Sequence, residues 1–322
     1  MIIDDITLTD SIGKGSFAEV FLTTKKDGQT KYATKVYDLS EYKDDMKRRY
    51  LDNEISILKE VNHPNIIKLI EIKEKDNKMY VVTEYCNGGS LSEFFEKYRK
   101  ENKPLSEEIV QYIMKQVIEG FKYLSSKDII HRNIKLESLL INYEDENDRK
   151  NNNILKGQIK IISFAFSKTL PKGNLTYTVL GSPIYMSPLL LKRLSGEKDY
   201  KKVGYDGKED IWSIGILCYE LLVGKTPFDS EDMDELNQKV NNGDYIIPIT
   251  LSKETVSFLN CMLQDDPKKR SSYDLLSSHN FLTKNIKEFT KINLDDLKNI
   301  KVGMLVNIKN NESIRDSFGN GN

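Results

Sequence analysis

Three polar residues in two short segments are of types that can position a hydroxyl group or a small ion. Asn133 follows His131-Arg132, Ser138 lies five residues further on, and Ser163 precedes Phe164-Ala165-Phe166. An asparagine amide can orient a hydroxyl group but cannot accept its proton. A serine hydroxyl is a poor ligand for a hard divalent cation, which prefers carboxylates. These residue types therefore predict positioning without general-base catalysis and without a metal site.

The secondary-structure elements that must position these residues start, at the N-terminal end of the chain, with predicted β-strands. The segments 19–22 and 32–36 are strand candidates, and Asp27-Gly28 between them suits a tight hairpin turn. Residues 44–61 predict a helix, because Leu51, Ile55 and Leu58 share one face. Two further strand candidates follow at 66–72 and 79–85.

Helical patterns dominate the rest of the chain, up to about Leu282. Ser106 is a candidate N-cap, and the two glutamates after it suit the positive end of a helix. Two long polar segments, 142–157 and 192–207, predict solvated surface loops.

Composition narrows the class of protein. The 322 residues are 39% hydrophobic and 30% charged, with a formal net charge of -1, so no global field favours nucleic acid or an anionic membrane. The three cysteines are far apart, which favours free thiols in a reducing compartment. The longest apolar stretch, 211–223, is too short to span a bilayer and contains Glu220. A soluble cytoplasmic protein is expected, with neither a nucleic-acid nor a membrane partner.

Several motifs, in order, resemble those of the eukaryotic serine/threonine protein kinases between Ile6 and Leu282. They are a glycine-rich loop (13–20), a strand lysine (33–35), a segment that enters a hinge (79–89), a catalytic loop (131–140) and Ser163-Phe164-Ala165 in place of Asp-Phe-Gly. The glycine-rich loop, the hinge and 161–168 look most similar to Unc-51-like kinases, a group that includes inactive members. A Gly-x-Gly turn alone would be weak support, so the series of motifs carries the resemblance.

The resemblance implies an α+β, bilobal protein-kinase fold. Residues 1–87 would form a small β-rich N-lobe with one regulatory helix and a hinge at 84–89. Residues 88–284 would form a larger, mainly helical C-lobe, and 285–322 a polar tail that docks partners.

It also implies a nucleotide site in which Lys35 forms an ion pair with Glu54 and the glycines let backbone amides approach phosphates. The residues implied for ATP binding are Gly13, Lys14, Gly15, Val20, Ala33, Lys35, Glu54, Thr83, Glu84, Cys86 and Leu140.

The departures from the family pattern are chemical. Asn133 stands where kinases have the Asp base, while Ser138 and Ser163 replace the magnesium-holding Asn and Asp; Lys135 is retained. No metal is therefore expected. A pocket that has lost carboxylates is more positive and could bind ATP without magnesium.

One further departure concerns the peptide-positioning segment 181–189. Leu189 stands where the family has a Glu that pairs with a distant arginine, here Arg270. An unpaired buried charge costs about 3–5 kcal/mol. Arg270 should therefore find another acceptor or turn to solvent.

Three hypotheses follow. The leading one is a degenerate kinase, a pseudokinase that is not an enzyme and serves as scaffold, allosteric partner or component of a larger protein assembly, including a cytoskeletal one. The alternative is an atypical serine/threonine kinase with residual phosphoryl transfer from ATP, favoured by Lys35, Glu54 and Lys135. The third is a nucleotide sensor, in which ATP would change the affinity for a partner.

Overall fold

The computed structural model describes residues 2–15, 18–25, 28, 30–42, 45–100, 103–243, 245–248 and 250–291. These residues divide into two compact units. One is drawn from residues 2–90 and 139–167, and the other from residues 91–138 and 168–291. The first unit is discontinuous in sequence because 139–167 pack with the N-terminal part. The boundary at 87/88 stays a prediction, and tail residues 292–322 lie outside the described part.

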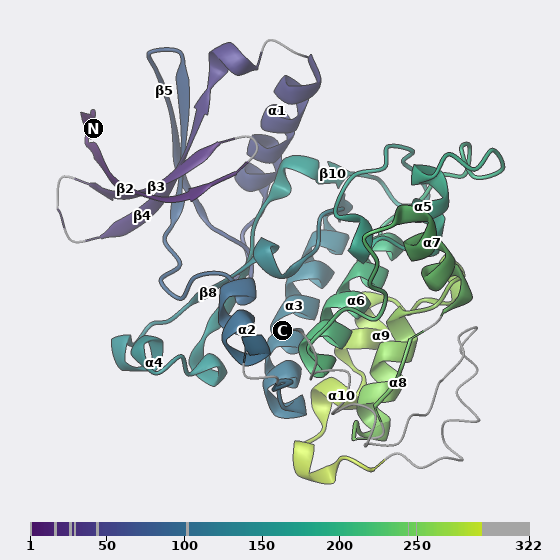
Figure 1. Ribbon diagram of the computed structural model, residues 1–322. Coiled ribbons are helices and arrows are strands. Elements are labelled where there is room, and N and C mark those ends of the chain that lie inside the picture. The colour runs from purple at the N-terminus through teal and green to yellow at the C-terminus, as the bar shows by residue number, and fades with distance from the viewer. Residues whose placement is uncertain are drawn as a thin grey trace, which may run out of the picture. The chain divides into compact units, whose positions relative to one another are not determined.

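The first unit is built on a six-stranded antiparallel sheet of order β1-β2-β3-β4-β6-β5. Figure 1 shows helix α1 beside this sheet. The strands are β1 (Ile2–Ile3), β2 (Ile6–Lys14), β3 (Glu19–Lys25), β4 (Lys31–Asp38), β5 (Leu69–Lys75) and β6 (Lys78–Glu84), and the helix is α1 (Asp45–Glu60). Ile6, Leu8, Tyr80 and Val82 form a buried cluster on the sheet.

Helix α1 confirms the predicted helix at 44–61. Leu51 and Leu58 are buried on the face that the spacing indicated, and Glu54 and Ile57 are buried with them. The predicted strand at 66–72 is shifted: β5 begins at Leu69 because Ile67 donates its amide proton to the carbonyl of Ile161 instead.

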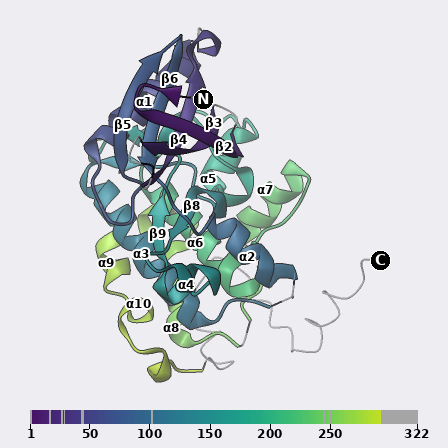
Figure 2. The same cartoon turned by 90° about the vertical axis from the view of Figure 1, so that its left-hand side faces the viewer.

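The predicted surface loop at 142–157 contains ordered structure in the first unit. It joins β8 (Leu139–Asn142) to β9 (Gln158–Ile161) and contains α4 (Glu146–Lys150), which Figure 2 shows beside these strands. Tyr143 and Ile154 are buried in it, so the segment is not a simple solvated loop.

The second unit is mainly helical. Its elements are α2 (Leu91–Lys100), α3 (Glu107–Ser126), β7 (Ile129–Ile130), β10 (Lys168–Thr169), α5 (Pro188–Leu194), α6 (Lys208–Val223), α7 (Met233–Asn242), α8 (Lys253–Met262), α9 (Tyr273–Ser277) and α10 (Asn280–Thr283). As predicted, Ser106 caps α3, and its hydroxyl accepts from the amide of Ile109 at 3.4 Å. Helices α3 and α6 contact each other and supply much of the buried core.

The α+β architecture predicted from the sequence is confirmed: a β-sheet unit with one long helix, and a mainly helical unit. Within the described residues, no helix combines the length and hydropathy that crossing a bilayer requires.

Candidate functional site

The residues implied for nucleotide binding all belong to the first unit. Across β3 and β4, Val20 lies opposite Lys35, and Ala33 lies opposite Thr83 of β6. Ala33 and Lys35 are two positions apart on β4 and so project from the same face. The Thr83 hydroxyl donates to the carbonyl of Ala33 at 3.3 Å. Antiparallel register thus brings four of the predicted residues together.

The glycine-rich segment is the end of β2 and the turn after it. Gly13 pairs with Val20, and the amide of Gly15 donates to the carbonyl of Ala18 at 2.9 Å. Gly13, Lys14 and Gly15 are all exposed, while residues 16 and 17 lie outside the described part.

The Lys35–Glu54 ion pair predicted from the sequence is present. Lys35 Nζ lies 2.5 Å from Glu54 Oε1, and the Tyr37 hydroxyl donates to Glu54 Oε2 at 2.9 Å. Burial, together with the negative charge of Glu54, raises the pKa of Tyr37 far above its usual value, so its hydroxyl remains a donor. Both oxygens of a buried carboxylate are therefore held, and Glu54 fixes the lysine.

The other implied residues lie at the end of β6 and on β8. The Glu84 carboxylate accepts from the amide of Lys68 at 2.8 Å and pairs with Lys160 at 2.9 Å. Cys86 is buried, and desolvation raises the pKa of its thiol to about 12, so it stays protonated near neutral pH. Leu140 is half-buried on β8.

Ser163 takes an unusual backbone conformation. Its φ of +72° lies in the left-handed region, which costs a non-glycine residue about 1–2 kcal/mol. The residues after it are anchored on α1: the Asn53 amide donates to the carbonyl of Ser167, and the rings of Tyr50 and Phe166 meet edge to face at 5.4 Å. The strained serine is thus held in place by its neighbours.

Residues 131–138 of the catalytic loop belong to the second unit, where Asp210 organises the backbone of His131 and Arg132. Its carboxylate accepts from the amides of His131 at 2.6 Å and Arg132 at 2.8 Å. Burial raises the pKa of Asp210 to about 6, and these two hydrogen bonds oppose that rise.

Ser138 uses its hydroxyl within its own loop. It donates to the carbonyl of Lys135 at 2.7 Å and accepts from the amide of Lys135 at 3.0 Å. The Lys135 ammonium lies 4.0 Å from Glu137. Asn133 borders a small hollow with Ser182.

A divalent cation does not fit these residues. The Ser138 hydroxyl is engaged by backbone, Ser163 offers a neutral oxygen, and Asn133 has an amide in place of a carboxylate. The described residues also contain no group of three or more His, Cys, Asp or Glu side chains arranged to hold a metal. We therefore derive no catalytic step through a metal ion.

Arg270 has found another acceptor, as expected from Leu189. It is 2% exposed, and its guanidinium lies 3.1 Å from Glu209 Oε1. It also donates to three backbone carbonyls and lies over the ring of Trp212, 5.2 Å from the centroid.

Two residues that shape the site were missed from the sequence. Tyr37 could have been found, because it is two positions after Lys35 and therefore on the same face of the strand. Glu209 gave no local signal, because its partner is 61 positions away along the chain.

Comparison with known proteins identifies the family to which the chain belongs. The chain matches the protein kinase domain over residues 6–282, and it therefore belongs to the protein kinase family. It is 32% identical over 288 residues to serine/threonine-protein kinase atg1 of Dictyostelium discoideum (88% of this chain, 40% of that protein). It is 36% identical over 279 residues to maternal embryonic leucine zipper kinase of Xenopus tropicalis (85% and 38%). A probable myosin light chain kinase of Dictyostelium discoideum is 32% identical, with 88% and 85% covered.

The chain thus spans about two fifths of the length of the first two relatives. Serine/threonine-protein kinase apg-1 of Neurospora crassa is 29% identical over 323 residues (88% and 32%). The relatives named atg1 and apg-1 agree with the predicted similarity to Unc-51-like kinases, but other kinases match as well, so the subgroup stays a prediction.

The prediction that the chain is not an enzyme is contradicted. Relatives at 29–36% identity are named as serine/threonine protein kinases, which points to an enzyme. Three positions are substituted, but the framework around them is retained, because Lys35, Glu54 and Asp210 keep their contacts.

Proposed function

We propose that this chain is an atypical serine/threonine protein kinase that transfers the γ-phosphoryl group of ATP to a protein hydroxyl at a low rate. The observation that carries the proposal is the Lys35–Glu54 ion pair, which Tyr37 completes. Phosphoryl transfer draws on positioning and on charge stabilisation, and a lysine held by a buried glutamate supplies a fixed positive charge for both. The kinase names of the relatives support it.

Each residue group has a role in the proposed step. Lys35 neutralises the α- and β-phosphates, the absence of side chains at Gly13 and Gly15 lets the phosphates approach the backbone, and Asn133 orients the acceptor hydroxyl. The hydroxyl oxygen bonds to the γ-phosphorus while the bond to the β–γ bridging oxygen breaks, and ADP leaves. Because Asn133 cannot accept the proton, the proton passes to an oxygen of the transferred phosphoryl group or to water.

The low rate of phosphoryl transfer follows from the absence of a general base. Loss of a general base costs about 10²–10⁴-fold, measured against kinase turnover of roughly 1–100 s⁻¹. We propose that ATP binds without magnesium. The side chains at positions 133, 138 and 163 are neutral, whereas Lys35 keeps a positive charge opposite Val20.

Radiolabelled ATP and broad protein substrates test the activity on the full chain. Lys35→Met should abolish incorporation, whereas Lys31→Met, an exposed lysine of the same strand, should leave it unchanged. Incorporation no greater than in Lys35→Met would refute phosphoryl transfer.

Thermal unfolding tests nucleotide binding separately. ATP should raise the melting temperature equally with and without EDTA. A shift that requires magnesium would contradict the metal-free mode, and no shift in either condition would contradict nucleotide binding.

We also propose a cytoplasmic location and protein partners. Cys86, Cys218 and Cys261 are free thiols, which suits a reducing compartment. Imaging of the tagged chain tests the location, and a signal from a secretory compartment would contradict it.

A further inference from the structure

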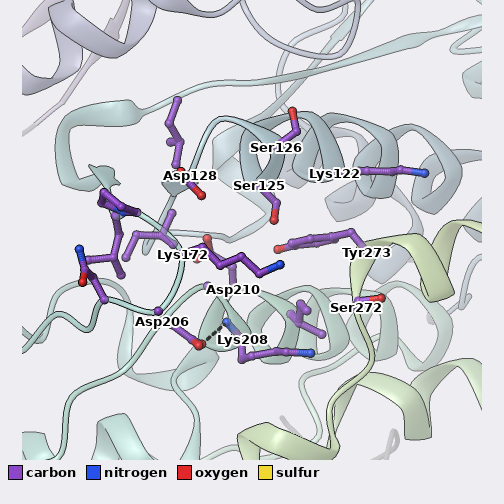
Figure 3. A pocket seen from close by; sticks show the side chains of 18 of the residues that line it. Lys122, Ser125, Ser126, Asp128, Lys172, Asp206, Lys208, Asp210, Ser272 and Tyr273 are labelled. Atoms are coloured by element: carbon purple, nitrogen blue, oxygen red, sulfur yellow. Dashed lines mark hydrogen bonds between the residues drawn. The ribbon is translucent and has the colours of Figure 1, made fainter.

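The described part of the second unit contains two cavities of about 480 Å³ each. Figure 3 shows the first, in which the Lys172 ammonium and the Tyr273 hydroxyl point toward each other. Lys208 Nζ donates to two backbone carbonyls at 2.7 and 3.0 Å, and Lys122 pairs with Asp274 at 3.1 Å. The Asp206 and Asp210 carboxylates accept from backbone amides, so most of its charged groups already have partners within the protein and this cavity identifies no ligand.

The second cavity differs because buried acceptors border it. Three stretches supply most of its lining: the start of α5, residues 203–206 with Tyr200, and residues 265–268. Glu209, in the first turn of α6, and Asn241, in the last turn of α7, also border it.

Both of these side chains have an oxygen that lacks a donor. Glu209 is 4% exposed. The Arg270 guanidinium lies 3.1 Å from Glu209 Oε1 but makes no well-aligned hydrogen bond to it. Glu209 Oε2 has no hydrogen-bond partner in the described part of the protein. The Asn241 amide group donates to Asn237 at 2.7 Å, but its buried Oδ1 accepts from no described group. A buried acceptor without a donor is unfavourable, and a donor-bearing ligand would remove that cost.

The charge around the cavity favours a cation. Asp206, Asp265 and Asp266 border it together with Glu209. Two lysines are among its described lining residues: the Lys192 ammonium lies 4.8 Å from the centroid of the ring of Tyr200, which also lines the cavity, and Lys268 is exposed to solvent. The four acidic side chains outnumber them.

The rim of the cavity is apolar. Leu175 and Val203 both border it and are 47% and 41% exposed, although leucine and valine usually lie inside a protein. An aliphatic stem that passes between them would cover part of this apolar surface.

We propose that this cavity receives an arginine side chain of a partner polypeptide. A guanidinium carries five donors in a rigid fork, enough to serve Glu209 Oε2 and Asn241 Oδ1 together. The arginine stem would pack on Leu175 and Val203. The site uses neither the nucleotide nor the phosphoryl-transfer residues, so its test is independent of activity.

The test uses the full chain and a fluorescent, end-capped pentapeptide with arginine at its centre and leucine on either side. A matched peptide carries citrulline, the neutral isostere of arginine. Fluorescence polarisation should show saturable binding of the arginine peptide, with citrulline weakening it about tenfold or more, as expected when a charge-assisted hydrogen bond is lost.

Two variants locate the binding. Val203→Arg places a positive charge at the rim and Asn241→Leu removes one acceptor, and both should weaken binding. Asp274→Asn removes a carboxylate beside the other cavity and should leave binding unchanged. The proposal is overturned if the peptide does not bind up to about 1 mM, if citrulline binds equally, or if Val203→Arg binds as the parent does.

Discussion

Arg270 shows how a buried charge dictates the residues around it. Its side chain is fully enclosed, and three backbone carbonyls occupy its donors, yet carbonyl dipoles alone leave a full positive charge. Glu209 supplies the opposite charge from the first turn of α6. Where the family pattern has a glutamate at position 189, this chain has Leu189, so the acid comes from another element.

Glu209→Gln should therefore destabilise the second unit by about 3–5 kcal/mol, because it leaves a buried guanidinium without a countercharge. Trp212 is the single tryptophan and lies under that guanidinium, so its fluorescence during urea unfolding reports the change directly.

The double variant Glu209→Gln with Leu189→Glu should recover much of that loss, because the carboxylate returns to the position that the family pattern uses. Leu189→Gln in the same background is the control for size and polarity. Equal stability of the two double variants would show that a carboxylate at position 189 cannot replace that of Glu209 as the partner of Arg270.

Asp210 gives a second residue-scale prediction, which concerns pH. Its folded-state pKa of about 6 lies above the usual carboxyl value of 3.8, so the folded protein holds the proton more tightly than the unfolded chain. Stability from this group is therefore present at low pH and is lost as the pH rises from about 4 to 6.

The measurement is the free energy of unfolding of the parent minus that of Asp210→Asn, which does not titrate. This difference should fall by up to about 3 kcal/mol between pH 4 and pH 6, and stay flat above. A difference that grows with pH would show that the hydrogen bonds from His131 and Arg132 outweigh burial.

At the scale of elements, the segment between β8 and β9 is fastened to the end of β6. The Asn87 side chain accepts from the amide of Tyr143 at 2.8 Å and donates to its carbonyl at 2.9 Å. Gly88 makes this approach possible, because a Cβ there would lie 2.7 Å from the Tyr143 ring. The segment between β8 and β9 therefore touches the chain next to Cys86.

Asn87→Ala should free this segment, because it removes both hydrogen bonds to the Tyr143 backbone. Hydrogen exchange across 143–157 should become faster, and stability should fall by about 1–3 kcal/mol. Asn151→Ala, an exposed asparagine of the same segment, should change neither quantity. Unchanged exchange in Asn87→Ala would mean that Ile154 and Tyr143 hold the segment by packing alone.

The same segment shows what local sequence reveals. The period of Leu51 and Leu58 predicted α1 correctly, because a helix repeats every 3.6 residues and the signal is local. In 142–157 the polar residues hide two apolar anchors, Tyr143 and Ile154, whose burial depends on partners distant in sequence. The start of β5 was misplaced for a similar reason, since Ile67 bonds to Ile161.

The residues of the candidate site likewise fall into those that local sequence predicts and those that it does not. Lys35 and Glu54 were found because a known motif series places them, and Tyr37 follows from strand alternation. Glu209 and Asn241 belong to no motif. Their roles arise from the packing of elements around them, which the sequence pattern does not encode.

At the scale of the whole molecule, the residues that depart from the kinase pattern are shared between the two units. Ser163 belongs to the first, and Asn133 and Ser138 belong to the second. The framework in each is intact, since Glu54 holds Lys35 in one and Asp210 holds the catalytic loop in the other. The missing chemistry should therefore be recoverable by side-chain replacement alone.

The triple variant Asn133→Asp, Ser138→Asn and Ser163→Asp should phosphorylate protein substrates about 10²–10⁴ times faster than the parent. Each change suits its place. Aspartate has the shape of asparagine at 133, asparagine can keep a local bond to the backbone of Lys135, and aspartate tolerates the positive φ at 163 better than serine does.

The gain should depend on magnesium, because the restored carboxylates are the ligand types that this cation prefers. EDTA should therefore abolish the increase and leave only the parent's rate, and Lys35→Met in the triple background should remove both. An increase that persists in EDTA would mean that the carboxylate introduced by Asn133→Asp acts alone as a base. No increase at all would place the rate limit in the framework, against the view that Lys35, Glu54 and Asp210 already hold their working positions.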